Sequence, residues 1–463
     1  MNSIFVKIAA ALCSLLFAVA GVSESVVGYT EGKPITAEKQ EYDFDNSGLL
    51  IGGYYGAAGQ AQYAKEAGLD FVISASVSQA MLDEYEENGV GVIAAGYNLP
   101  RYYGTVTEAN AQQWLTFTGE GYKDHPALWG DDLIDEPNAP SFPALAGCVK
   151  AYRAVNPNKI SLINLFPNYA NDEQLGEEPT MTFAQKLPLL FTDVIDGNNE
   201  IFRKYTSDYI NTIDTDYICV DIYPFNSTVD RSGNEVKSTS TCYIRNLDIL
   251  AEACRETNRD FWVITQAAGE TKNGSPEGSK PRYCDEVSDI SQQAYACLSF
   301  GAKAIIHGLF SNMGWWDVDS HMIGSDGKPT ETYYVAQKVD FDLKAFSAIY
   351  GHYTYSSTYM VNAARVAGRG RGPLMTTKAE DKAKIVSANG LLVGAFKGEK
   401  DGKAYVITNM EELNNQTTAR ASFFVPDGMV ATVYQGGENK AFGGGHYIDL
   451  TLAPGEGVFI TLQ

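Results

Sequence analysis

The stretch "ALWGDDLIDEP" (127–137) is an apolar run that ends in two adjacent carboxyl groups and a proline. Seven more short apolar runs occur along the chain, and helix-like stretches separate them. Strands that alternate with helices indicate βα units and a parallel sheet. The other runs are "GLLIGGYYG" (48–56), "DFVISAS" (70–76), "GVGVIAAG" (89–96), "KISLINLFPNY" (159–169), "DYICVDIYPF" (216–225), "FWVITQAAG" (261–269) and "AKAIIHGLF" (302–310).

These runs predict an α/β fold, a closed (β/α)₈ TIM barrel over residues 46–355, because each strand is almost continuously apolar. An open doubly wound sheet is the competing fold, but no Gly-rich dinucleotide turn follows the first strand. After about residue 355 the apolar segments become short, and Gly, Asn and Asp turns separate them. We therefore expect a linker over 356–388 and a small antiparallel β-sandwich over 389–463.

The N-terminus has the pattern of an export signal. Residues 1–20 contain a lysine, a short apolar run and the small residues Ala18, Val19 and Ala20, which are typical of a signal peptide and its cleavage site. The run is short for a membrane span, and no later segment is long and apolar enough to cross a bilayer. We expect a secreted protein, extracellular or periplasmic, in which residues 21–45 form an N-terminal lead.

The charge of the chain restricts its partners. The formal net charge is −22, whereas nucleic-acid binding requires clustered Lys and Arg, so we expect no nucleic-acid partner. An acidic protein also repels anionic polymers, which favours neutral substrates. The sequence does not determine the oligomeric state.

Six cysteines follow the leader, and none forms a C-x-x-C pair. Zinc sites and thioredoxin-type redox sites are therefore not expected. Cys219 lies inside a strand-like run and is interpreted as a core residue. Disulfides among the other five remain open, because sequence cannot choose a pairing.

Candidate functional residues follow the strands, because active sites of such barrels form at the C-terminal ends of the strands. The residues found there are carboxylates, amides and aromatics, with no Ser–His pair and no histidine cluster. They are Tyr54, Tyr55, Asp135, Glu136, Asn164, Phe166, Asn168, Asp221, Tyr223, Gln266 and, in the loop after the eighth strand, Trp315 and Trp316.

This combination favours glycosidic cleavage. One acid must protonate the leaving oxygen, and a second carboxylate must attack the sugar or activate water. Aromatic rings stack on sugar rings, and amides bind hydroxyl groups. Structural explanations compete: Tyr54 and Tyr55 suit a core equally well, and Asp221 would also suit a structural ion pair. Glu136 has few structural uses, because Pro137 fixes it at the mouth of the barrel.

A metal site is the alternative for the segment "WWDVDSH" (315–321). Asp317, Asp319 and His321 alternate there, and their oxygen ligands would suit calcium. The segment lacks the glycine and the terminal glutamate of a calcium-binding loop. We interpret it as a substrate-binding loop and expect no metal and no cofactor.

The chain resembles the TIM-barrel glycoside hydrolases of the large retaining clan, and most of all secreted bacterial proteins of the family 42 β-galactosidase-like kind. The resemblance implies carbohydrate as the partner and Glu136 as the general acid/base, at the end of the fourth strand. In that clan the residue before this glutamate is usually Asn, whereas here it is Asp135. The motifs that carry the resemblance are "WGDDLIDEPN", "INLFPNYA", "DIYPF", "GAKAIIHGLF", "IGSDGKPTETYYVAQKV" and "LAPGEGVFITL".

One departure from the clan concerns the nucleophile, which the clan places as Glu at the end of the seventh strand. This chain has Gln266 there, and an amide cannot act as a carboxylate. Asp221 at the end of the sixth strand is the replacement candidate, and Glu270 is the remaining one. Three hypotheses follow: a glycoside hydrolase, a barrel that binds carbohydrate without cleaving it, and a sugar transferase.

Overall fold

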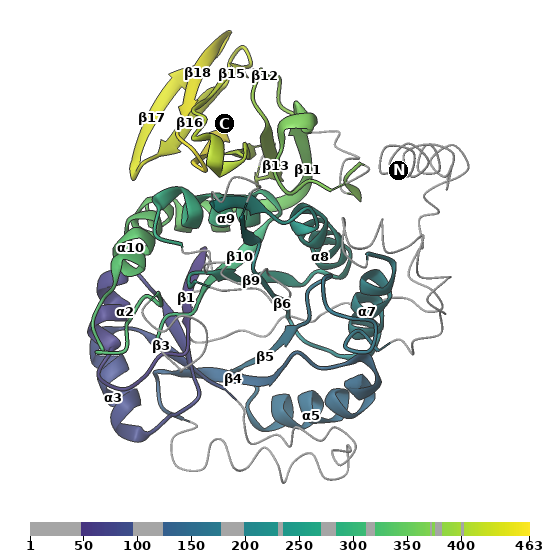
Figure 1. The fold of residues 1–463 in the computed structure, drawn as a ribbon, viewed down its shortest axis with the longest axis vertical. Helices are drawn as coiled ribbons and strands as arrows, with labels where there is room; N and C mark the ends of the chain where they lie inside the picture. Colours follow the sequence, from purple (N-terminus) through teal and green to yellow (C-terminus); the bar gives the residue numbers. More distant parts are fainter. Residues whose placement is uncertain are drawn as a thin grey trace, which may run out of the picture. The chain divides into compact units, whose positions relative to one another are not determined.

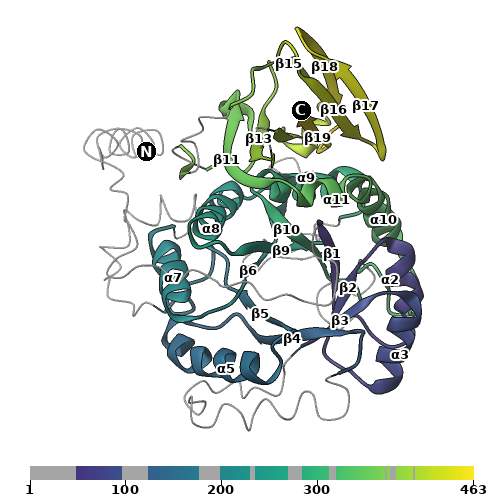
Figure 2. The ribbon, with the colours of Figure 1, turned by 180° about the vertical axis from the view of Figure 1, so that it is seen from behind.

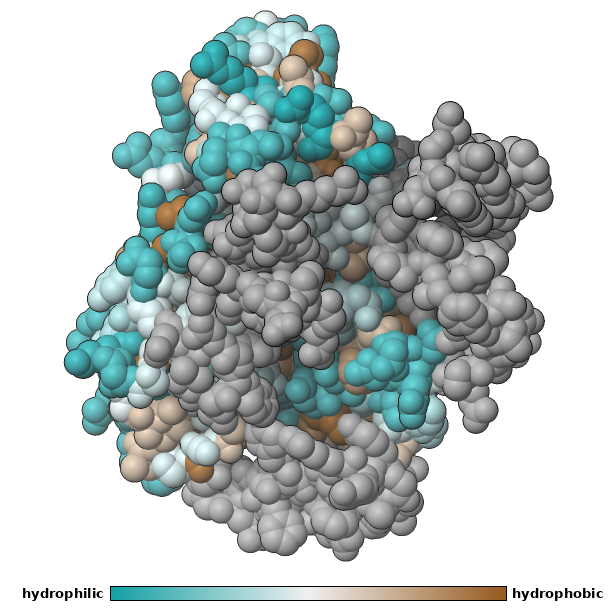
Figure 3. Space-filling view, viewed as in Figure 1, coloured by the Kyte–Doolittle hydropathy of each residue, from teal (hydrophilic) through white to brown (hydrophobic). Residues whose placement is uncertain are grey.

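The computed structural model describes nine stretches of the chain. They are 48–95, 124–176, 199–229, 235–269, 284–311, 320–370, 373–375, 382–399 and 402–463. The expected leader and N-terminal lead, and the two tryptophans Trp315 and Trp316, lie outside these stretches. Within them, no helix combines the length and the apolar character that a membrane crossing requires. On the face drawn in Figure 3 the described surface is mainly hydrophilic, with small scattered hydrophobic patches.

A closed barrel of eight parallel strands forms the first part of the fold (Figure 1), in the order β1-β10-β9-β6-β5-β4-β3-β2. Each of the eight apolar runs supplies one strand, which confirms the predicted (β/α)₈ barrel. The strands are β1 (Leu50–Tyr54), β2 (Phe71–Ser74), β3 (Gly91–Ala95), β4 (Leu128–Asp135), β5 (Ile160–Leu165), β6 (Tyr217–Ile222), β9 (Asp260–Gln266) and β10 (Ala302–Gly308). A hairpin of β7 (Phe225–Val229) and β8 (Glu235–Thr239) follows β6.

Helices surround the strands on the outside (Figures 1 and 2). Two of them end at a glycine: Gly68 (φ 88°) and Gly89 (φ 69°) close their helices in the left-handed conformation, which glycine adopts without strain. The helices are α2 (Ala61–Ala67), α3 (Gln79–Asn88), α5 (Phe142–Val155), α7 (Asn199–Thr212), α8 (Tyr243–Thr257), α9 (Val287–Ser299), α10 (Glu331–Lys344) and α11 (Ser347–Gly351).

Large aromatic side chains fill the interior of the barrel. The ring of Trp262 lies 4.6 Å from that of Tyr217 and 5.6 Å from that of Phe71, measured between centroids. Gly52 makes room for Phe71, because a Cβ on Gly52 would lie 2.5 Å from the Phe71 ring. The interior is therefore a packed core, and a ligand can bind only at its mouth.

The second part of the fold consists of antiparallel sheets. A six-stranded sheet has the order β11-β13-β14-β19-β16-β17, and a three-stranded sheet has the order β12-β15-β18. Apolar side chains from both sheets form one buried cluster, as in a β-sandwich. The strands are β11 (Thr354–Val361), β12 (Ile385–Ser387), β13 (Leu391–Lys397), β14 (Lys403–Asn409), β15 (Ala419–Val425), β16 (Val430–Gln435), β17 (Glu438–Gly443), β18 (His446–Leu452) and β19 (Gly457–Leu462).

The sandwich begins earlier than its expected start at residue 389. Strand β12 and all but the first two residues of β11 lie inside the range 356–388, which the turn pattern assigned to a linker. β11 pairs with β13 over seven residue pairs from Thr354↔Lys397 to Val361↔Leu391, and β12 pairs with β15. The polar residues of "TYSSTYMV" hid the strand, because pairing with β13 rather than apolar content specifies it.

Helix α9 of the barrel packs directly on the sandwich. A Cβ on Gly457 would lie 2.2 Å from Tyr295, and one on Gly394 would lie 2.3 Å from the carbonyl oxygen of Ser299. Only glycine permits this approach. The amide of Gln292 also donates a hydrogen bond of 3.0 Å to the carbonyl oxygen of Glu411.

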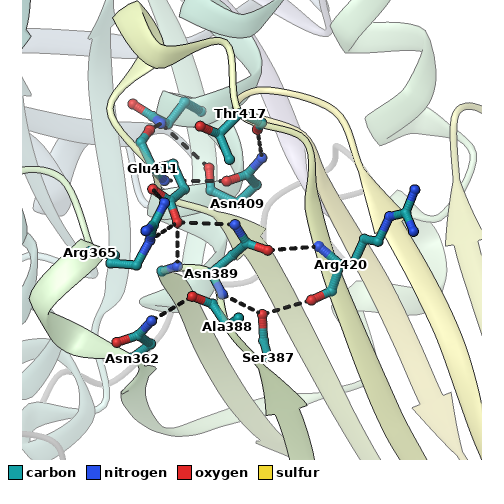
Figure 4. Close-up of polar contacts among 11 residues, drawn as sticks. Asn362, Arg365, Ser387, Ala388, Asn389, Asn409, Glu411, Thr417 and Arg420 are labelled. Atoms are coloured by element: carbon teal, nitrogen blue, oxygen red, sulfur yellow. Dashed lines mark hydrogen bonds and ion pairs between the residues drawn. The ribbon is translucent and has the colours of Figure 1, made fainter.

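Glu411 is the centre of a polar network in the sandwich (Figure 4). Its carboxylate accepts hydrogen bonds from Arg365 Nε (2.6 Å) and Nη2 (2.8 Å). Asn389 Nδ2 (3.2 Å) and the backbone N–H of Gly390 (2.9 Å) also donate to it. Burial alone would raise the pKa of Glu411, but these donors outweigh it and hold the pKa below its usual value.

All the described cysteines are buried, and no disulfide joins any two of them. Cys219 is a core residue, as expected, with no exposed surface. The six are Cys148, Cys219, Cys242, Cys254, Cys284 and Cys297.

Candidate active site

An irregularity in β4 determines which of its side chains enter the barrel. The pairing of β4 with β5 shifts between Asp132 and Ile134, so that Asp132 lies opposite Leu162 and Asp135 opposite Asn164. This shift is a β-bulge, in which one residue of β4 has no partner on β5. Without the bulge, the alternation of side chains along a strand would place Asp132 and Asp135 on opposite faces of the sheet. The bulge puts both on the inner face, and Asp135 thereby reaches the mouth of the barrel.

Glu136 follows in a left-handed conformation with φ 49°, which is rare for a residue other than glycine. Its backbone N–H donates to Asn164 O (2.9 Å), and the next carbonyl, Pro137 O, accepts from the hydroxyl of Tyr205 (2.6 Å). Such a conformation costs on the order of 1–3 kcal/mol and persists where surrounding contacts enforce it, commonly at functional sites. The chain is thus held in an unfavourable turn that presents Glu136 to the cavity.

A cavity of about 450 Å³ opens at the C-terminal ends of the strands. It has the size of a small-ligand site. Most of the residues predicted from the strand ends line it, together with several from the loop after β5. Its wall consists of Tyr54, Tyr55, Asp135, Glu136, Asn164, Phe166, Pro167, Tyr169, Ala170, Gln174, Asp221, Tyr223, Ile264 and Leu309.

Asn164 joins two of the three acids in this wall. Its Nδ2 donates to Asp135 Oδ1 (2.9 Å) and to Asp221 Oδ1 (3.1 Å). Asn164 and Asp221 are buried, with exposed fractions of 2 % and 8 %, whereas Asp135 is exposed. The amide therefore fixes Asp221 at the base of the cavity and Asp135 at its rim.

The carboxyls of Glu136 and Asp221 have strongly altered acidity. Burial raises the pKa of Glu136 to about 9, and repulsion from Asp221 and Asp135 adds to the effect. Burial, followed by repulsion from Asp135, raises the pKa of Asp221 to about 7, although hydrogen bonds from Asn164 and Tyr223 oppose the shift. Glu136 therefore holds its proton at neutral pH, and Asp221 ionises less readily than an ordinary Asp does.

The two tyrosines at the end of β1 belong to the packed core as well as to the cavity wall. Tyr54 is 6 % exposed, and its hydroxyl donates to Asp132 Oδ2 (3.1 Å). Tyr55 is 3 % exposed and packs edge-on against Tyr54, with ring centroids 4.5 Å apart. Both predicted positions are therefore at the cavity, but each side chain is almost wholly buried.

Two predicted residues, Gln266 and Asn168, do not line the cavity. Gln266 has no exposed surface; its Oε1 accepts from the N–H of Phe225 (3.2 Å), and its Nε2 donates to Ala268 O (3.3 Å). Asn168 is equally buried and donates to Asn199 Oδ1 (3.1 Å). We expected both at the substrate because of their place after a strand, but their amides satisfy backbone and loop groups instead.

The loop after β5 contributes Tyr169 and Gln174 to the wall, although neither residue was predicted from the sequence. Tyr169 is 41 % exposed, and its hydroxyl accepts from the backbone N–H of Tyr223 (3.1 Å). This contact connects the loops after β5 and β6. An aromatic and an amide shortly after Pro167 were the available signal, but only the folded loop shows that they turn back over the barrel.

The calcium alternative concerns a segment that lies mostly outside the described residues. No group of three or more His, Cys, Asp or Glu side chains there is arranged to hold a metal ion. His321 is fully buried, whereas Asp317 and Asp319 lie outside the described residues. The expectations for Trp315 and Trp316 likewise concern residues outside that part.

Comparison with solved structures places the chain among TIM-barrel glycosidase folds. A glycoside hydrolase family 5 protein from Bacteroides vulgatus matches with a TM-score of 0.50 and 12% sequence identity, over 93% of each chain. A second structure, described only as a glycoside hydrolase, matches with the same TM-score and identity over 93% of this chain and 96% of its own. No protein-family profile and no curated protein sequence matches. At this identity the similarity shows the fold, and it does not support family 42 in particular.

Proposed function

We propose that this protein is a secreted glycoside hydrolase that cleaves an oligo- or polysaccharide, with Glu136 as the general acid/base and Asp221 as the second carboxylate. The observation that carries the proposal is that Glu136 and Asp221 line one cavity at the C-terminal ends of the strands, where burial and neighbouring carboxyls raise both pKa values. Two carboxyls held in different protonation states are what glycosidic cleavage requires. The similarity to glycoside hydrolase folds adds support, and the N-terminal signal pattern supports secretion.

In the proposed reaction Glu136 donates its proton to the glycosidic oxygen as the bond to the anomeric carbon breaks. Asp221 then attacks that carbon or removes a proton from a water molecule that does so. Asn164 holds Asp221 in place through the hydrogen bond of 3.1 Å. After cleavage Glu136 is ionised and can accept a proton again.

A second candidate function is carbohydrate binding without cleavage. It is favoured by Gln266, since related enzymes have their nucleophilic glutamate at this strand end, and here the side chain is buried and bonded to the backbone. The cavity would then retain its aromatic and carboxylate wall but lack a competent nucleophile.

Incubation of the purified protein with a panel of plant and microbial glycans distinguishes the two functions. The hydrolase proposal predicts new reducing ends with the wild type and none above background with Glu136→Gln purified in parallel, which controls for contaminating glycosidases. If some glycan binds but no glycan is cleaved, the binding function is correct and the hydrolase proposal is wrong.

A further inference from the structure

The turn that presents Glu136 is held by two different parts of the barrel. On one side the backbone N–H of Glu136 donates to the carbonyl oxygen of Asn164 (2.9 Å), in the neighbouring strand β5. On the other side the carbonyl oxygen of Pro137 accepts from the hydroxyl of Tyr205 (2.6 Å), a residue of helix α7. The proline ring fixes its own φ at about −65°, so the chain has little freedom between these two contacts.

The hydroxyl of Tyr205 also contacts the segment that follows β5. Its oxygen accepts from the backbone N–H of Phe166 (3.4 Å), and Phe166 belongs to the cavity wall. A tyrosine hydroxyl has one donor, which Pro137 O takes, and its oxygen remains free to accept. One side chain therefore joins the turn that carries Glu136 to the neighbouring part of the wall.

Packing holds the Tyr205 ring in the position that these hydrogen bonds require. The residue is 1 % exposed, and its ring centroid lies 5.2 Å from that of Phe142 and 6.3 Å from that of Phe202. Burial raises the pKa of Tyr205 well above its ordinary value, and the nearby carboxyls of Glu136 and Asp221 add to the effect. The hydroxyl therefore keeps its proton at neutral pH and remains a hydrogen-bond donor.

A left-handed backbone at a residue other than glycine persists only where its surroundings enforce it. Without the contact to Pro137 O, the backbone of Glu136 would relax, and its carboxyl would move with it. A displacement of about 1 Å can lower a rate by about 10²-fold. We propose that Tyr205 is a positioning residue, whose hydroxyl holds the turn after β4 and so keeps the carboxyl of Glu136 within reach of the glycosidic oxygen.

This inference rests on the proposed function and adds to it a residue that acts only through Glu136, since Tyr205 does not line the cavity. Tyr209 provides a matched control one helical turn further along α7. It is fully buried, its ring also packs on Phe142, and its hydroxyl shares a hydrogen bond of 3.0 Å with Thr215 Oγ1. Tyr205→Phe and Tyr209→Phe each keep the ring and lose one buried hydroxyl, so both should lose similar stability.

The kinetic test uses phenyl and 2,4-dinitrophenyl glycosides of the sugar or oligosaccharide that the wild type releases. Phenolate is a poor leaving group that needs a proton from the acid, whereas dinitrophenolate leaves almost without one. Tyr205→Phe should lower kcat/KM on the phenyl glycoside by about 10- to 100-fold and hardly change it on the other. Tyr209→Phe should match the wild type on both. An equal loss on the two glycosides, or equal rates in the two variants, overturns the inference.

A titration without substrate separates this inference from the hydrolase proposal. With glutamate labelled at its carboxyl carbon, the NMR signal that is lost in Glu136→Gln identifies Glu136. Burial raises its pKa to about 9 in the wild type. Release of the turn should expose the carboxyl to water, so this pKa should fall by about one unit or more in Tyr205→Phe and stay unchanged in Tyr209→Phe.

Equal pKa values of Glu136 in the two variants would show that the Tyr205 hydroxyl does not position the carboxyl. Failure of the hydrolase proposal looks different: the wild type cleaves no glycan, and the titration still shows the fall in Tyr205→Phe alone.

Discussion

Two groups of carboxyl groups in this molecule, each wholly or partly withdrawn from solvent, have opposite surroundings. Glu411 in the sandwich is 5 % exposed and accepts four hydrogen bonds, two of them from Arg365. Glu136 and Asp221 line one cavity together with Asp135, with amide and hydroxyl groups but no described cation on the cavity wall. The pKa of Glu411 is lowered, while the pKa values of the other two are raised.

The difference separates a structural role from a functional one. Burying an ion costs free energy that donors must offset, and at Glu411 the donors do so. At the cavity the cost is not offset, so the fold is less stable than it would be with uncharged groups at these positions. Such uncompensated acids are functional-site candidates on physical grounds alone, without any related sequence.

The largest expected effect comes from Glu136→Gln. The amide keeps the size of the side chain but cannot donate a proton to the leaving group, so turnover should fall by about 10²–10⁴-fold. Substrates with poor leaving groups should lose most, which aryl glycosides of graded leaving-group acidity measure. Stability at neutral pH should not decrease, because the change removes an acid surrounded by like charges. A variant with the wild-type rate on a natural glycan would show that Glu136 is not the acid.

Asp221→Asn should give the next largest loss, of the order of 10²-fold or more, if Asp221 is the second carboxylate. The configuration of the first product, followed by NMR in the wild type, then reports its role. Carboxyl groups about 5–5.5 Å apart would give retention by direct attack, and a separation of roughly 6.5–9.5 Å would give inversion through water. Full activity in the variant would exclude Asp221 and leave Glu270 as the remaining candidate.

Glu411→Gln makes the same substitution, Glu to Gln, at the carboxylate of the sandwich. The new amide NH₂ would face Arg365 and lose charge-assisted hydrogen bonds, so the free energy of unfolding should fall by about 1–3 kcal/mol. Activity per folded molecule should stay at the wild-type value, since the residue lies in the sandwich. Urea unfolding and a rate assay on the same samples measure both. A loss of rate without a loss of stability would contradict the structural role.

The sequence predicted the barrel well because the signal is local. Each strand is a compact apolar run. Helices end at Gly68 and Gly89 because glycine readily adopts the left-handed conformation. The start of the sandwich was misplaced, because β11 is specified by pairing with a strand that lies 30 or more residues further along the chain. Such non-local pairing leaves little trace in composition.

For the site, the sequence predicted which residues end a strand but not which way their side chains point. Asp135, Glu136 and Asp221 reach the cavity, while Gln266 and Asn168 turn to other partners. Nothing in "LWGDDLID" reveals the bulge that puts Asp135 on the inner face. The missed residue Tyr169 depends on the path of a loop, which only the folded chain determines.

The smallest expected effect is a difference in the pH dependence of stability between the two groups of acids. Glu136 has a raised pKa, about 9, in the folded state, so between about pH 5 and 9 the folded protein holds a proton that the unfolded chain has released. The free energy of unfolding therefore falls as pH rises through this range, because of Glu136. Glu411 has a lowered pKa, so its contribution is present at neutral pH and is lost as pH falls below about 5.

Urea unfolding of the wild type, Glu136→Gln and Glu411→Gln at several pH values measures these contributions as differences, in which all other titrating groups cancel. The free energy of unfolding of the Glu136→Gln variant should increase relative to that of the wild type as pH rises from about 5 to 9. The difference in free energy of unfolding between Glu411→Gln and the wild type should stay constant over that range. It should become smaller only in acid. If Glu136→Gln also runs parallel to the wild type throughout, Glu136 ionises normally in the folded state. The cavity would then hold no proton for the leaving group at neutral pH, and the contrast with Glu411 would disappear.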